Sequence, residues 1–356
     1  MRTPSLVRRP PLSAVLVLLG ATLIPGLATA QPLGAWLNVT GPTHGYIAVP
    51  TSPDLTPATA LTLEAWVNVT DAHGGGCSSI VGKNYTQAWW VGICGTTLRS
   101  YVRGLGSAKN GGTIPAGQWT HIAVTFEGGV RKHYINGELI SSFLDPGALT
   151  GSAAELRIGS DVSWQFTPSG SLDEVRLWSV ARTIDQIRAN INVTISPQAG
   201  LVGYWKLDAS GLDASGNGHN GVVSGSGTSF SVGPAIISCG SSGSTVLCLN
   251  TVLAVSAKFR VGAPGTAETQ AHVAVSSANS GIFYFFAANN WEVTVKTVDG
   301  CGVNPYYWVF VTSDTSLFYR LEVTDVLAGA TKVYFNWPTL TPFSILDTQA
   351  FSKGCF

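Results

Sequence analysis

The sequence has few charged residues and no cluster of basic ones. Lysine and arginine number 20 of 356 residues, aspartate and glutamate another 20, and only 11% of the chain is charged. Binding to nucleic acid phosphates requires several cations on one face, so we expect no nucleic acid partner. Beyond residue 30 the chain also lacks an apolar run of the roughly twenty residues that span a bilayer. We therefore expect no transmembrane segment.

The first thirty residues have the three parts of a secretory signal peptide. Three arginines lie near the start, residues 14–24 are almost unbroken apolar, and Ala28-Thr29-Ala30 is an A-x-A cleavage site. The apolar run is too short for a membrane anchor. We predict cleavage after Ala30 and a secreted, extracellular or cell-surface protein. The remaining 326 residues carry 17 basic and 20 acidic side chains.

Six cysteines in an exported protein favour disulfide bonds. Cys77 and Cys94 lie in the first half of the chain, and we expect them to pair. The four cysteines of the second half allow three pairings, of which we expect Cys239–Cys248 and Cys301–Cys355. A zinc site is not expected, because no spacing is C-x-x-C and no histidine lies nearby in the sequence.

Alternating polar and apolar residues predict strand after strand, as in an all-β protein. In residues 61–69 every second side chain is apolar, which predicts a strand with one buried face. Asn136-Gly137 tolerates the positive φ angles of a type I′ turn and predicts a hairpin between residues 133–135 and 138–140. The other strands expected before residue 226 span residues 119–126, 156–159, 172–178 and 201–207.

A capping box marks one short helix within this pattern. Thr183 and Gln186 can satisfy each other's free backbone N–H groups. Ile184, Ile187 and Ile191 then form one apolar stripe. We expect the helix to lie against an end of a β-sandwich.

A stretch rich in glycine and serine, residues 224–231, marks a domain boundary. Residues 282–286 beyond it are mostly aromatic and uncharged, which is typical of a strand buried on both faces. We therefore predict a second, smaller Greek-key β-sandwich. Its strands are expected at residues 252–261, 271–276, 281–286, 291–298, 306–312, 317–324 and 331–336.

The first domain resembles a known family in the order and spacing of its motifs. The motifs are GYIAVP at 45–50, LTLEAWV at 61–67, WTHIA at 119–123, YINGE at 134–138, GSLDEVRLW at 170–178 and DASGNG at 213–218. They make residues 31–226 similar to the laminin-G-like members of the concanavalin A-like jelly-roll superfamily. This resemblance implies a jelly-roll sandwich that presents loops at its rim.

The second domain resembles a small cysteine-flanked β domain that recurs at the C-termini of bacterial exported proteins. The motifs are LCLN at 247–250, FRV at 259–261, VKTVDGC at 295–301, YWVF at 307–310 and DTQAF at 347–351. The resemblance implies a bacterial exported protein and no particular activity. We predict a signal peptide at 1–30, a jelly roll at 31–226, a linker at 227–238 and a disulfide-clipped sandwich at 239–356.

Catalysis is not expected, although the superfamily includes glycanases. Glycoside hydrolysis needs two carboxyl groups about 5–10 Å apart that both face the substrate. Asp173 and Glu174 are adjacent in a predicted strand and should point to opposite faces. Leu172 and Arg176 flank them where the resemblance would require acids. The resemblance implies that Asp173 and Glu174 have a structural role and that His121 is packed in the core.

One loop has the composition of a calcium site. Asp213, Ser215 and Asn217 carry oxygen-bearing side chains at alternate positions, the spacing of a tight Ca²⁺ loop. By analogy with jelly rolls that bind calcium at the rim, Asp161 and Asn84 are candidate additional ligands. The alternative is that Asp213 and Asn217 only stabilise turns.

Tryptophans are the other candidates for binding, because sugars stack on exposed aromatic rings. Trp164 is expected in a loop beside Asp161, and the adjacent Trp89 and Trp90 must point to opposite faces of a strand. We predict a secreted, non-catalytic module that binds a glycan or an extracellular protein through rim loops. The alternatives are a structural surface-display protein without a small ligand and a degenerate glycan-acting enzyme.

Overall fold

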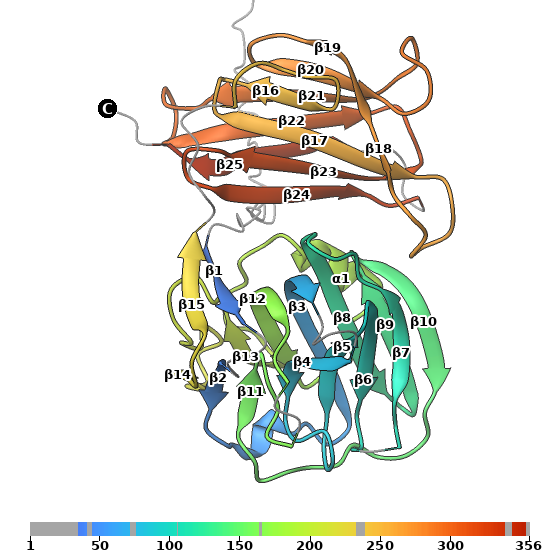
Figure 1. Cartoon of the computed structure of the whole chain (residues 1–356), viewed down its shortest axis with the longest axis vertical. Coiled ribbons are helices and arrows are strands. Elements are labelled where there is room, and N and C mark those ends of the chain that lie inside the picture. Colours follow the sequence, from blue (N-terminus) through green and yellow to red (C-terminus); the bar gives the residue numbers. More distant parts are fainter. Residues whose placement is uncertain are drawn as a thin grey trace, which may run out of the picture.

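The computed structural model describes residues 35–40, 45–71, 76–104, 106–163, 166–232, 239–338 and 344–353. Within these ranges the protein is nearly all β, with two sandwiches and one α-helix, α1 (Ile184–Asn190) (Figure 1). The predicted all-β fold of a jelly roll followed by a second sandwich is confirmed. The predicted signal peptide, Trp164 and Cys355 lie outside the described residues.

The first domain consists of two antiparallel sheets packed face to face. The first sheet has the order β10-β9-β8-β3-β12-β1-β15, with β13 paired to β12, and the second has the order β14-β2-β11-β4-β5-β6-β7. The strands are β1 (Ala35–Val39), β2 (Tyr46–Val49), β3 (Ala60–Asp71), β4 (Cys77–Gly82), β5 (Trp90–Cys94), β6 (Thr97–Tyr101), β7 (Lys109–Thr113), β8 (Thr120–Glu127), β9 (Val130–Ile135), β10 (Glu138–Leu144), β11 (Leu156–Ile158), β12 (Ser169–Trp178), β13 (Leu201–Trp205), β14 (Val222–Ser224) and β15 (Thr228–Val232).

The first domain extends beyond its predicted end at residue 226. Strand β15 lies inside the predicted linker 227–238 and pairs along its whole length with β1. Gly225 and Gly227, with φ of 73° and 79°, form the turn that leads into it. The glycine-rich stretch is thus a turn within the domain, because glycine adopts positive φ without steric cost.

Strand β3 is buried on both faces, whereas its alternation predicted one exposed face. Leu63, Ala65 and Val67 point into the core, as expected. The side chains of Glu64 and Trp66 on the other face are also buried, at 0% and 2% exposed. Helix α1 and the second domain cover that face, so the helix lies on the outside of the first sheet rather than at its end.

The locally encoded elements form as predicted. Asn136 and Gly137 have φ of 50° and 73° and connect β9 to β10. The capping box of α1 is complete, with Thr183 accepting from the Gln186 N–H and Gln186 accepting from the Thr183 N–H. Ile187 is fully buried against the sheet.

The second domain is a sandwich of two five-stranded antiparallel sheets. One has the order β16-β17-β23-β24, with β18 paired to β17, and the other has the order β19-β20-β21-β22-β25. The strands are β16 (Val246–Leu249), β17 (Leu253–Arg260), β18 (Thr269–Gln270), β19 (His272–Ser276), β20 (Ser280–Tyr284), β21 (Trp291–Asp299), β22 (Tyr306–Ser313), β23 (Phe318–Asp325), β24 (Ala330–Asn336) and β25 (Ile345–Ser352).

The prediction that residues 282–286 are buried on both faces is wrong. Phe283 is fully buried in the core, but Ile282 and Tyr284 are half-buried and Phe286 is 60% exposed. The other sheet of this domain faces the jelly roll, which leaves the outer face of the sheet containing β20 open to solvent.

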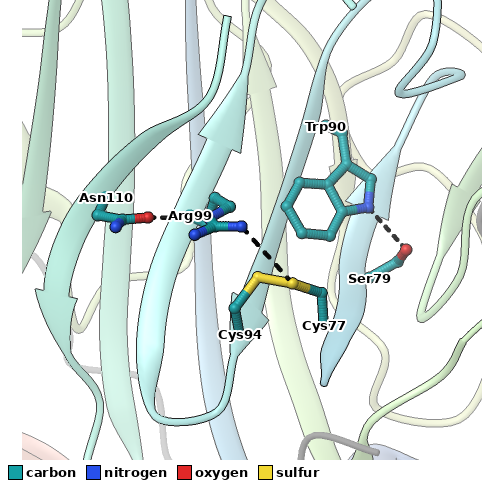
Figure 2. Close-up of a disulfide and its surroundings, with 6 residues drawn as sticks. All are labelled: Cys77, Ser79, Trp90, Cys94, Arg99 and Asn110. Atoms are coloured by element: carbon teal, nitrogen blue, oxygen red, sulfur yellow. Dashed lines mark hydrogen bonds between the residues drawn. A yellow bond between two sulfur atoms is a disulfide. The ribbon is translucent and has the colours of Figure 1, made fainter. Parts of the chain in front are cut away.

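Two of the three expected disulfide bonds, Cys77–Cys94 and Cys239–Cys248, are present. Cys77 and Cys94 are directly opposite each other on β4 and β5. Figure 2 shows this bond beside Trp90 and Arg99, whose guanidinium approaches the Cys77 sulfur at 3.9 Å. The Cys301–Cys355 pair stays a prediction, because Cys355 lies outside the described residues.

Replacing both Cys77 and Cys94 by serine should lower the free energy of unfolding by about 3 kcal/mol. The bond closes a loop of sequence separation 17, which restricts the unfolded chain. Urea unfolding of the double variant measures this loss. Reduction of the wild type should give a larger loss, because it also breaks the Cys239–Cys248 bond. A loss of less than about 1 kcal/mol would contradict the loop-closure argument.

The two domains meet through an aromatic cluster. Trp66 and Ile191 of the first domain pack against Phe335 and Trp337 of the second. The Trp66 and Phe335 rings are stacked with centroids 6.3 Å apart. Trp337 donates from its indole nitrogen to the carbonyl of Asn136 at 2.9 Å, so the predicted hairpin turn becomes a docking point.

Candidate functional site

A network of buried charges lies on the outer face of the first sheet, beneath α1. Glu64 accepts from Arg182 at 3.1 Å. Arg176 donates to the carbonyls of Asn190 and Val193, at 2.7 Å each. Because these bonds fix the end of α1 and the segment after it to the sheet, the network is structural. It shapes the surface beside the helix.

Asp173 and Glu174 belong to this network and do not face solvent. They lie at a bulge in β12, where Glu174 has a φ of 52°. Glu174 accepts from Arg176 and from the Tyr204 hydroxyl, at 2.5 Å each. The side chains of Asp173 and Glu174 are 0% and 3% exposed. In this arrangement neither carboxyl group can contact a substrate.

Replacing Asp173 by asparagine should stabilise the fold at neutral pH. Burial and the neighbouring Glu174 raise the pKa of Asp173 well above its usual value of 3.8. The folded state therefore keeps a proton that the unfolded chain releases. Stability is lost as the pH rises above the usual pKa of 3.8. We expect Asp173→Asn to raise the free energy of unfolding at pH 7 by about 1–3 kcal/mol.

At pH 3 the same substitution should have little effect, because the carboxyl group is then mostly protonated in both states. Urea unfolding at the two pH values measures the difference. Equal effects of Asp173→Asn at pH 3 and pH 7 would show that ionisation of this buried group does not limit stability.

Asp213 and Asn217 are brought together, in the geometry of a hydrogen-bonded turn. Burial alone would raise the pKa of Asp213, but N–H groups of Tyr204, Ser215 and His219 donate to its oxygens and lower it below the usual value. The Asn217 amide donates to two main-chain carbonyls of β13. These hydrogen bonds agree with the alternative that Asp213 and Asn217 only stabilise turns. Calcium at this loop stays a prediction.

Asp161 and Asn84 also meet, at a separate pair of loops. Asp161 accepts from the Asn84 N–H at 2.7 Å and from the Ser163 N–H at 2.8 Å. Asn84 has a φ of 78° and accepts from the Ser163 hydroxyl at 2.9 Å. Among the described residues no group of three His, Cys, Asp or Glu side chains could hold a metal.

Neither Trp89 nor Trp90 presents an exposed ring, which corrects their proposed role in ligand stacking. Trp89 is 1% exposed in the core and donates to the Leu55 carbonyl. Trp90 lies on the other face, as the alternation requires, but is only 2% exposed. Its ring lies edge-on to Tyr101 and over Gly92, where any Cβ atom would clash with it. Trp164 lies outside the described residues.

A groove of about 440 Å³ opens on the outer face of the first sheet, beside the start of α1. Its floor is formed by outward-facing side chains of β8, β9 and β10, and one wall by the segment that leads into the helix. The residues that line it are Thr125, Glu127, Val130, Lys132, Tyr134, Leu139, Ala181, Arg182, Thr183 and Ile184.

The groove combines apolar surface with hydrogen-bonding groups. Leu139 is 41% exposed, and Glu127 and Lys132 place opposite charges at the opening. Burial raises the pKa of Tyr134, so its hydroxyl keeps its proton at neutral pH. Apolar walls with a few polar groups are typical of small-molecule sites. A sugar, with apolar ring faces and a rim of hydroxyls, fits this chemistry.

Most of the first domain matches a known family. Residues 41–188 match the concanavalin A-like lectin/glucanases superfamily. This match covers the paired strands β2 to β12 and the start of α1. The first domain is a concanavalin A-like jelly roll. No curated protein matches the sequence significantly.

Several solved structures are similar to part of this chain. One is a protein of Bacteroides ovatus to which carbohydrate binding has been attributed, 21% identical over 58% of this chain and 60% of that one, with a TM-score of 0.45. A second is a heptameric SAP-like pentraxin of Limulus polyphemus, 19% identical over 56% and 95%, with a TM-score of 0.42. A third is domain 4 of an extracellular arabinanase of Geobacillus stearothermophilus, in complex with arabinotriose, 20% identical over 45% and 98%, with a TM-score of 0.33.

The sequence did not single out the groove of the jelly roll as a site. The feature of the sequence that could have indicated the groove is the alternation in the predicted hairpin. Val130, Lys132 and Tyr134 occupy every second position of β9. Those positions lie on the outer face, opposite the side chains that enter the core. The groove also depends on how α1 packs over that face. This packing joins segments that are far apart in the chain, so the local sequence does not show it.

Proposed function

We propose that the jelly roll is a glycan-recognition domain and that the groove beside α1 is its binding site. The observation that carries this proposal is the combination, in one depression, of an exposed apolar surface and charged and hydroxyl groups. The size of the groove is in the range of sites for small ligands, about 300–1,000 Å³.

Two further observations support the proposal. The matched superfamily is described as lectins and glucanases, so glycan recognition is consistent with it. The two disulfide bonds are consistent with an extracellular protein. None of the helices in the described part of the chain is long and apolar enough to cross a membrane.

Binding to a glycan array should depend on Lys132. We expect Lys132→Ala to weaken binding at least tenfold, about 1.4 kcal/mol, because the ammonium group can donate to sugar hydroxyls. Lys296→Ala, at an exposed lysine of the second domain, is the matched control and should leave binding unchanged.

The same array tests the alternative site at the rim loops. If Trp164→Ala abolishes binding and Lys132→Ala does not, the glycan binds at the rim and the groove proposal is wrong. The same conclusion would follow if both lysine variants bound like the wild type.

We further propose that this domain binds glycans without cleaving them. Among the described residues that line the groove, Glu127 is the single carboxylate, whereas hydrolysis uses two. The mature protein should therefore release no reducing sugar from the glycans it binds. Release that is lost in Glu127→Gln would establish an enzyme and overturn this proposal.

A further inference from the structure

A second depression lies where the two domains meet. It is a cleft of about 420 Å³, and both domains contribute its walls. The jelly roll supplies the loop before β8 and the start of β10, and the second domain supplies β17 and the loop between β17 and β18. The polar side chains that line it include Gln118, Glu138, Lys258, Arg260, Thr266 and Glu268.

The loop between β17 and β18 forms the outer wall of this cleft. Figure 1 shows it descending from the second domain toward the jelly roll. A Cβ atom built on Gly265, near the tip of the loop, would be 3.6 Å from the Ile140 side chain on β10, which places the tip against the jelly roll. The cleft is therefore present only while the domains are docked.

Two polar contacts across the domain interface hold the walls of the cleft in place. Lys258 donates to the Gln118 side chain at 2.8 Å. Arg260 donates to Glu138 at 2.6 Å, and both side chains are only 3–4% exposed. Because each pair joins one domain to the other, these side chains are positioned before any ligand arrives.

Glu268 provides an acceptor that the protein does not use. Its Oε2 atom is buried and accepts no hydrogen bond from the described residues. The carboxylate is close enough to Glu138 to help raise the pKa of that group. A buried acceptor without a donor destabilises the protein, and a bound hydroxyl group would satisfy it.

We propose that this cleft binds a neutral oligosaccharide of two or three sugar units. Its charges balance, with Glu138 and Glu268 against Lys258 and Arg260, so it does not favour a strongly charged ligand. Glu268 can accept from sugar hydroxyls, and Lys258 and the amide of Gln118 can donate to their oxygens. Domain interfaces are common places for such sites. This site is separate from the groove beside α1.

Binding in the cleft stabilises the docked arrangement of the two domains. A ligand that contacts both walls binds only the docked form, so it shifts the equilibrium toward that form. The second domain thereby acquires a role in recognition, since the cleft does not exist in either domain alone.

Isothermal titration of the mature chain with neutral glucose-, galactose-, mannose- and N-acetylglucosamine-based di- and trisaccharides tests the proposal. At least one of these sugars should bind, and Glu268→Gln should weaken its binding at least tenfold. Asp314→Asn, at an exposed carboxylate of the second domain that lines neither depression, is the control and should leave this binding unchanged. If none of these sugars binds, or if binding does not depend on Glu268, the proposal is overturned.

A variant outside the cleft separates the two binding sites. Trp337→Ala should undock the domains and abolish the binding that depends on Glu268. Binding that depends on Lys132 should remain, because the groove lies wholly within the jelly roll. Retention of the Glu268-dependent affinity in undocked protein would place that binding elsewhere and overturn the proposal.

Discussion

Replacing Trp337 by alanine should split the thermal unfolding of this protein into two transitions and lower its stability by about 3–5 kcal/mol. Trp337 is only 7% exposed and lies between the domains. Its ring is stacked on Phe335 at 5.7 Å and lies beneath the Arg188 guanidinium at 4.9 Å. The indole nitrogen donates to the Asn136 carbonyl at 2.9 Å. Alanine removes all of these contacts and leaves a cavity.

Differential scanning calorimetry measures the outcome of this substitution. The wild type should unfold in one transition if docking couples the domains, and Trp337→Ala in two. Trp291→Ala is the matched control, because Trp291 belongs to the same domain but is 54% exposed. It should change the transition little. One unchanged transition in Trp337→Ala would mean that the aromatic cluster does not couple the domains.

The elements that the sequence predicted well are those that neighbouring residues determine. The turn at Asn136-Gly137 needs positive φ at both residues, and the capping box needs only Thr183 and Gln186. These requirements are met within a few residues of the chain, so the local sequence is enough to predict both elements.

The covered face of β3 could not be predicted in this way. Thr62, Glu64 and Trp66 alternate with apolar residues and therefore resemble a solvent-exposed face. They are buried because α1 and the second domain pack over them, with the charge of Glu64 met by Arg182. A polar residue that is buried against a distant partner gives the same alternation of polar and apolar residues in the sequence as an exposed polar residue.

The candidate tryptophans show the same limit. The alternation correctly placed Trp89 and Trp90 on opposite faces, with Trp89 in the core. Trp90 is nevertheless covered, because Gly92 leaves room for its ring to lie flat on the sheet and Tyr101 closes the side. The glycine two positions further along the strand was the signal available in the sequence. The groove and the cleft both depend on contacts between segments far apart in the chain.

The stability of this protein should fall steeply between pH 6.5 and pH 3 because of His133. Burial and the neighbouring Arg131 lower the pKa of His133 to about 3, from the usual 6.5. The ring is fully buried, with Ser100 Oγ at 2.7 Å from Nε2 and Ser141 Oγ at 2.9 Å from Nδ1. It is therefore neutral in the folded state at moderately acidic pH.

The sign of the effect follows from where the proton binds. Below pH 6.5 the unfolded chain protonates His133, whereas the folded protein does so only near pH 3, so acid favours unfolding across this range. At about 1.4 kcal/mol per pKa unit, the full loss is on the order of 4–5 kcal/mol. Above pH 6.5 this histidine should contribute no pH dependence.

Urea unfolding from pH 7 to pH 3.5 should therefore show a smaller slope in His133→Gln than in the wild type. Glutamine cannot take up the proton. The substitution also removes part of the packing of the ring and therefore lowers stability at pH 7. The pH dependence of the difference between the two proteins isolates the titration from that loss. His272→Gln, at an exposed histidine, should keep the wild-type slope. If His133→Gln also kept that slope, the acid sensitivity would have to come from other groups, such as the carboxylates that pair with buried arginines.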